Sequence, residues 1–71
     1  MREKTILIFD IPRELAPLRS KIHRKLNKIN ARKIQDSIWA SNSIDSLIEL
    51  ADEIKNSGAS SQVLKIEVIK W

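Results

Sequence analysis

The sequence contains no cysteine and only one histidine, His23. The absence of thiols excludes disulfide bonds and thiolate zinc sites, and a single imidazole excludes a metal site built from several histidines. One glycine and two prolines among 71 residues leave no room for a flexible linker between domains. We therefore expect a single domain over residues 1–71, with a small core of marginal stability as a monomer.

Aromatic side chains and long apolar segments are also scarce. The sequence has one phenylalanine, two tryptophans and no tyrosine: Phe9, Trp39 and Trp71. These are too few for a surface that stacks nucleic-acid bases. No apolar run approaches the roughly 20 residues of a membrane span, and the first apolar segment is interrupted by Asp10. We expect a cytoplasmic protein without an export signal and without membrane contact.

Positive charge is concentrated in one segment. Residues 13–33 carry a net charge of +7, whereas the rest of the chain carries −3. Such an asymmetry favours an anionic partner for the basic segment, and nucleic acid is the first candidate.

The first half of the chain predicts a strand, a helix and a hairpin. Residues 5–9 form a nearly continuous apolar run, typical of a central strand covered on both faces, and Pro12 ends it. An amphipathic helix should follow from Pro17 to about Asn30, because apolar residues recur at spacings of four, four and three: Leu18, Ile22, Leu26 and Ile29. Residues 31–41 predict a tight β-hairpin, with its apolar anchors at Ile34, Ile38 and Trp39.

The second half predicts another helix and a final strand. Asn42 or Ser43 can cap this helix, Gly58 should end it in a left-handed conformation, and its expected buried face is Ile44, Leu47, Ile48, Ala51 and Ile54. Residues 62–70 alternate as a strand with Leu64, Ile66 and Val68 on one face. The order β-α-β-β-α-β predicts an α+β, ferredoxin-like fold, a four-stranded antiparallel sheet with two helices on one face.

Asp10 is the candidate for catalysis and metal binding. It follows the first strand, and in this topology it shares one rim of the sheet with the Asp36-Ser37 turn. Its carboxylate can be a hard oxygen ligand for Mg²⁺ that assists phosphodiester hydrolysis, or a turn residue that hydrogen-bonds its own backbone. A lone carboxylate is a poor metal site, but a two-fold axis would supply a second copy. Because a chain this small gains stability by self-association, we expect a homodimer.

The basic helix is the candidate nucleic-acid-binding surface. Its lysines fall on one flank of the apolar stripe and can follow a phosphate backbone without reading bases, or form an ordinary solvated face. Ser37 can donate a hydrogen bond to a phosphate or satisfy the hairpin turn. His23 lies on the opposite flank, and we interpret it as a partly exposed bystander. The full candidate set is Arg13, Arg19, Lys21, Arg24, Lys25, Lys28 and Ser37.

Two segments resemble a known family. Residues 5–12, Thr-Ile-Leu-Ile-Phe-Asp-Ile-Pro, and residues 33–39, Lys-Ile-Gln-Asp-Ser-Ile-Trp, flank a basic helix. This arrangement is similar to the small CRISPR-associated endoribonucleases, the smaller subunit of the spacer-integration complex. Phenylacetate-degradation repressors carry related motifs, but with a separate DNA-binding domain. In two respects the sequence departs from the CRISPR-associated pattern: Asp36 replaces a frequent aromatic residue, and the sequence ends at Trp71, where family members usually continue into a strand that pairs with the partner subunit.

The resemblance implies a ferredoxin-like homodimer in which Asp10 of each protomer binds a catalytic Mg²⁺. The first hypothesis is therefore a Mg²⁺-dependent endonuclease, or an integrase scaffold, acting on RNA or DNA and docking the CRISPR integrase subunit. The second is a non-catalytic interaction or regulatory domain of the same fold that uses the basic helix to bind nucleic acid or an acidic protein.

Overall fold

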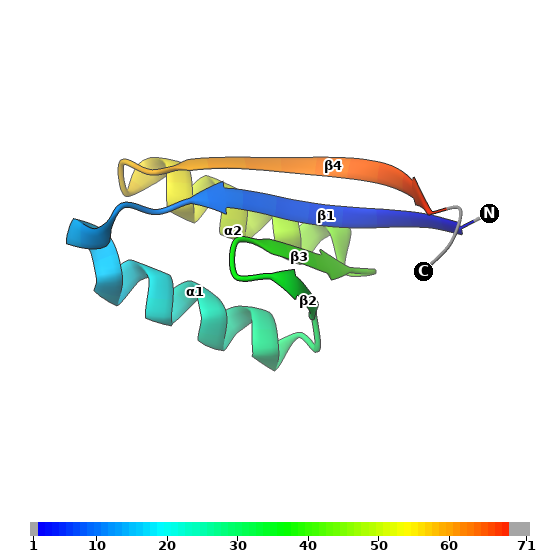
Figure 1. Ribbon diagram of the computed structural model, residues 1–71, viewed down its shortest axis with the longest axis horizontal. Coiled ribbons are helices and arrows are strands. Elements are labelled where there is room, and N and C mark those ends of the chain that lie inside the picture. The colour runs from blue at the N-terminus through cyan, green and yellow to red at the C-terminus, as the bar shows by residue number, and fades with distance from the viewer. Residues whose placement is uncertain (1, 69–71) are drawn as a thin grey trace.

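One antiparallel sheet and two helices make up the computed structural model, which describes residues 2–68 (Figure 1). The strands lie in the order β2-β3-β1-β4. Along the chain the elements are β1 (Arg2–Asp10), a short 3-10 helix η1 (Arg13–Leu15), α1 (Ala16–Lys28), β2 (Arg32–Gln35), β3 (Ile38–Ser41), α2 (Ile44–Asn56) and β4 (Ser60–Val68). This arrangement confirms the predicted ferredoxin-like α+β fold, with the first and third strands in the centre of the sheet.

β1 and β4, the first and last strands along the chain, are also the longest. In Figure 1, β1 and β4 run side by side, while the short β2–β3 hairpin extends the sheet on the other side of β1. β1 begins before the predicted Thr5, and β4 begins at Ser60, two residues before the predicted start. The predicted continuation of this strand to Lys70 lies outside the described residues.

Both helices cover the same face of the sheet. Leu7 is paired with Trp39 on β3 and with Val63 on β4, so these three side chains share one face. They pack in one apolar cluster with Ile22 of α1 and Leu47 of α2. The core therefore lies between the sheet and the two helices, as the fold prediction required.

Both helices end in the same backbone motif. Asn30 and Gly58 have positive φ angles of 58° and 92°. After each of them, the next amide closes the helix end: Ala31 N donates to Leu26 O at 2.9 Å, and Ala59 N donates to Ile54 O at 3.1 Å. This is the Schellman arrangement. The prediction for Gly58 is confirmed, and Asn, which tolerates the left-handed region, performs the same role after α1.

Two predictions about buried residues of α2 and the hairpin are wrong, and the predicted N-cap residue of α2 is in place without its side-chain hydrogen bond. Ile44 and Ile48, which were expected to be buried, are 39% and 45% exposed. Leu50, which was not expected to be buried, belongs to the core cluster. Ile34 is 38% exposed and does not anchor the hairpin, a role that falls to Trp39. Ser43 precedes α2, but its side chain makes no capping hydrogen bond. Instead, its amide donates to Ser41 Oγ at 3.0 Å.

The other face of the sheet is uncovered by helices. Ile6 and Ile8 alternate with the core residues of β1, and Ile6 is paired with Ala40 on β3 and Leu64 on β4. We call this the open face. Leu64 is 42% exposed there, so the predicted apolar side of β4 faces away from the helices. No helix within residues 2–68 has the length and apolar character needed to cross a bilayer.

Candidate functional site

Asp10 ends β1 on the open face of the sheet. Its backbone pairs with Ser60 at the start of β4, and it follows Ile6 and Ile8 in the alternation of β1. The residue is exposed, beside a shallow hollow that also includes Ser60 and Gln62. Within residues 2–68 its carboxylate has neither a hydrogen bond nor an ion pair, so the turn-cap interpretation finds no support in these contacts.

The described residues of one chain do not supply a complete magnesium site. Residues 2–68 contain no group of three or more Asp, Glu, His or Cys side chains close enough to hold a metal ion. Asp36, the other carboxylate expected at this rim, is engaged elsewhere: its Oδ1 lies 2.7 Å from Lys33 Nζ. Hydrogen bonding and charge from Lys33 lower the pKa of Asp36. Asp10 therefore fits a metal only together with ligands from outside residues 2–68.

The β2–β3 turn lies beside the end of β1, as predicted from the topology. Phe9 N donates to Ser37 O at 3.0 Å, which places the turn next to Asp10. The neighbouring carbonyl of Asp36 accepts a hydrogen bond from Trp39 Nε1 at 3.0 Å. The turn is thus fixed to two strands through its backbone, which agrees with the turn role predicted for the half-buried Ser37, while its hydrogen bond to a phosphate stays a prediction.

His23 holds the same turn from the helix side, so its interpretation as a bystander is wrong. Its Nε2 lies 3.1 Å from Asp36 O, and because a carbonyl oxygen only accepts, this contact requires a proton on Nε2. The ring packs between Phe9 and Trp39, with centroid distances of 6.0 and 5.5 Å. The sequence carried no local signal for this contact, which joins residues 13 positions apart.

The basic side chains of α1 gather as predicted. One shallow hollow on the surface is lined entirely by four of them, Lys21, Arg24, Lys25 and Lys28, which we call the basic face. Arg13 is exposed on η1. Arg19 has a structural contact, because its Nη2 donates to Ile11 O at 2.9 Å and fixes the loop after β1.

Glu53 of α2 is a member of this site that sequence reasoning missed. Its two carboxylate oxygens contact Lys25 Nζ at 2.6 Å and Lys21 Nζ at 3.0 Å. The hydrogen bond from Lys25 and the nearby ammonium group of Lys21 lower the pKa of Glu53, so the carboxylate stays ionised at neutral pH. Two of the four cations on the basic face therefore have an internal partner.

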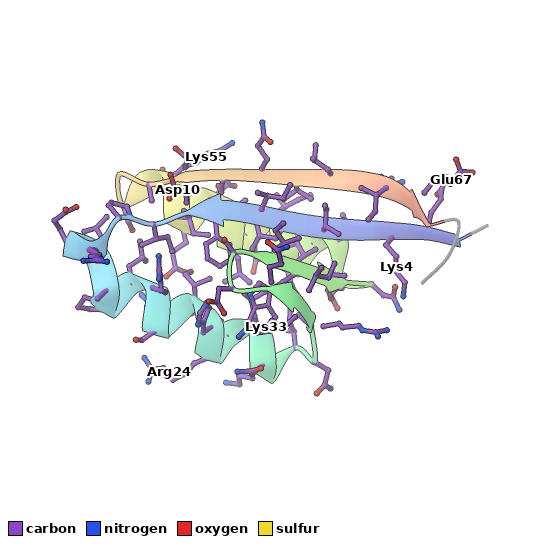
Figure 2. The ribbon with its side chains drawn as sticks, viewed as in Figure 1. Lys4, Asp10, Arg24, Lys33, Lys55 and Glu67 are labelled. Carbon is purple, nitrogen blue, oxygen red and sulfur yellow. The ribbon has the colours of Figure 1, made fainter. Side chains whose placement is uncertain are left out.

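Asp10 and the basic face lie on different sides of the molecule. Figure 2 shows Asp10 at the end of β1, while Arg24 projects from α1 at the opposite edge of the view, away from the sheet. The carboxylate lies on the open face, and α1 covers the other face. A single phosphate cannot contact both within one chain.

No protein family, curated protein or solved structure matches this chain.

Proposed function

We propose that this chain acts on nucleic acid as a cytoplasmic homodimer of the CRISPR-associated endoribonuclease type, in which Asp10 is the catalytic carboxylate. The observation that carries the proposal is the position of Asp10. Its carboxylate is exposed, has no partner within residues 2–68 and stands on the open face of the sheet in line with Ile6 and Ile8.

The open face is the proposed dimer interface. Its apolar side chains include Leu64, which is 42% exposed, and the half-buried Ile8, Ile38 and Ile66. A second copy covering this face would remove apolar surface from water in a chain whose own core is small. Because a two-fold interface uses the same patch twice, it would also place a second Asp10 at the same interface.

Two facing Asp10 carboxylates would give Mg²⁺ a second protein ligand, which residues 2–68 of one chain do not place beside Asp10. Mg²⁺ held between them would neutralise the charge that develops on a phosphodiester and orient a water for attack. The role of the chain itself is to hold each Asp10 at the end of a rigid central strand. The hydrogen bond from Phe9 to the β2–β3 turn fixes this rim, so the carboxylate is positioned by backbone pairing on both sides.

The basic face is the proposed phosphate-binding surface. Arg24 and Lys28 have no ion pair or hydrogen bond through their side chains within residues 2–68, so they can contact phosphates directly. Arg13 extends the positive charge toward the start of α1. Contacts of this kind bind the nucleic-acid backbone and give a strong dependence on salt.

A second candidate is a non-catalytic domain that binds nucleic acid as a scaffold for an integrase, or that regulates an acidic protein partner. The separation between Asp10 and the basic face favours it, since phosphates bound on α1 lie away from the carboxylate. In this case the basic face carries the whole function and Asp10 has none.

Asp10→Asn tests the two candidates against each other. Labelled single- and double-stranded RNA and DNA are incubated with the wild type, with Asp10→Asn and with Asp52→Asn as a matched exposed control, in Mg²⁺ or EDTA. We expect Mg²⁺-dependent cleavage that Asp10→Asn reduces by orders of magnitude, with binding and melting temperature unchanged because the side chain makes no hydrogen bond or ion pair within residues 2–68. Binding without cleavage by the wild type would favour the scaffold, and equal cleavage by Asp10→Asn would overturn the catalytic role.

A further inference from the structure

Glu53 presents its carboxylate to the basic face as a phosphate would. Lys21 and Lys25 lie on successive turns of α1, and their ammonium groups contact different oxygens of the same carboxylate, at 3.0 and 2.6 Å. The contact to Lys25 is a hydrogen bond, while Oε2 has only the ion pair with Lys21 and no well-oriented donor. Two lysines that converge on one anion with two oxygens form an arrangement equally suited to a phosphate group.

The position of Glu53 allows exchange with an external anion. It lies at the border of the basic face, beside a second hollow that it shares with Lys25 and Lys28. Its side chain is 24% exposed, and those of Lys21 and Lys25 are 52% and 45% exposed. Although Glu53 Oε2 itself is buried, both lysines are accessible to water, so the ion pairs are weak and a phosphate that approaches the basic face can displace the carboxylate.

We infer that Glu53 is an internal competitor of phosphate, and that it limits the affinity of the basic face for nucleic acid. The inference rests on the proposed role of this face in binding phosphates. In the free protein Arg24 and Lys28 are available, whereas Lys21 and Lys25 are held by Glu53. A phosphate backbone must break both ion pairs before it can engage all four cations, and binding is weaker by the free energy of those pairs.

Three variants separate this competition from a general charge effect. Glu53→Gln removes the competing charge, and Asp52→Asn removes the same charge from the neighbouring exposed position of α2. Glu53→Asp keeps the net charge but shortens the side chain by one methylene, so that it cannot reach both lysines as Glu53 does. Binding of a fluorescein-labelled oligonucleotide, followed by anisotropy at one fixed low salt concentration, compares them.

We expect Glu53→Gln to tighten binding by about three- to tenfold, since two exposed ion pairs no longer compete. Glu53→Asp should tighten it by a smaller factor, and Asp52→Asn by less than about twofold. In a Lys21→Gln/Lys25→Gln background, Glu53→Gln should have no effect beyond that of Asp52→Asn. Thermal melting of each variant verifies that it is folded, and Glu53→Asp remains informative if Glu53→Gln is not.

Two results would overturn the inference in different ways. If Asp52→Asn tightens binding as much as Glu53→Gln, or if the Glu53→Gln effect survives without the lysines, Glu53 acts only through net charge. If the wild type and every variant fail to bind the oligonucleotide at low salt, the basic face is not a phosphate-binding surface, and the inference is lost together with the function that it refines.

Discussion

The two faces of the sheet use the same central strand for different purposes. On the covered face, Leu7 and Phe9 are almost completely buried against α1 and α2. On the open face, Ile6 is also buried, but its neighbour Leu64 is 42% exposed and Asp10 stands at the rim without a partner in residues 2–68. One face completes its packing within the chain, whereas the other presents apolar surface and a free carboxylate. This difference indicates that stability is concentrated on the covered face, while the open face is the surface for which we propose self-association.

The carboxylates of the two sides differ in the same way. Glu53, on the helix side, is held by two lysines that lower its pKa, while Asp10 has no cation beside it in the described part of the chain. A paired carboxylate contributes to folding, and an unpaired one at the end of a rigid strand is available for a ligand.

The largest expected effect is the loss of stability on truncation of a leucine of the covered face, compared with truncation of a leucine of the open face. Leu7→Ala should lower the free energy of unfolding by about 2 to 5 kcal/mol, because Leu7 is fully buried in the core cluster. Leu64→Ala should cost less than about 1 kcal/mol in the monomer, since Leu64 already contacts water. Urea denaturation followed by circular dichroism at low protein concentration measures both. Equal costs for the two variants would contradict the assignment of stability to the covered face.

A second prediction concerns the open face and the dissociation constant of the proposed dimer. Leu64→Glu should raise the dissociation constant of the proposed dimer by at least about tenfold, about 1.4 kcal/mol, because it buries a charge in the interface. Ile48→Glu is the matched control: Ile48 is 45% exposed, but it lies on α2, away from the open face. Sedimentation velocity over a range of concentrations gives the constants. A monomeric wild type, or a dimer that Ile48→Glu disrupts equally, would remove the open face as the interface.

The smallest expected effect is the pH dependence of the stability that the ion pairs of Glu53 with Lys21 and Lys25 contribute. Because the pKa of Glu53 is lower in the folded chain than its unfolded value of about 4.3, its ion pairs stabilise the fold above about pH 5. This contribution is lost as the pH falls through the folded pKa. Glu53→Gln should cost less than about 1 kcal/mol at pH 7 and converge with the wild type in acid.

Asp10→Asn serves as the control for this series, and its stability at pH 7 should match that of the wild type, because Asp10 makes no ion pair within residues 2–68. Chemical denaturation at a series of pH values, with the protein dilute enough to be monomeric, compares the three proteins. A difference between Glu53→Gln and the wild type that persists at pH values where the folded protein has Glu53 protonated would show that Glu53 acts through packing and not through its charge.

Much of the fold was predictable because local pattern and turn chemistry agree with the tertiary structure. The apolar spacing of α1, the left-handed residue Gly58 and the turn at Asp36-Ser37 all appear where the sequence indicates them. The grouping of the basic face was predictable for the same reason, since helical periodicity alone places its four members together.

Other features depended on which surfaces meet. Periodicity could place Ile44 and Ile48 on an apolar flank of α2, but only the docking of α2 beside β4 decided that Leu50 is buried and Ile48 is not. The alternation of apolar and polar residues in β4 could be predicted from the sequence. Which face of the sheet Leu64 occupies could be decided only from the register between β1 and β4.

The sequence by itself determined the order of the elements, the ends of the helices and the position of Asp10 after a central strand, because each follows from neighbours within a few residues. Only the tertiary structure decided the partners of Glu53 and His23. Lys25 and Glu53 are 28 positions apart, and His23 and Asp36 are 13 apart. Contacts at such separations form when whole elements pack, so no local pattern of residues encodes them.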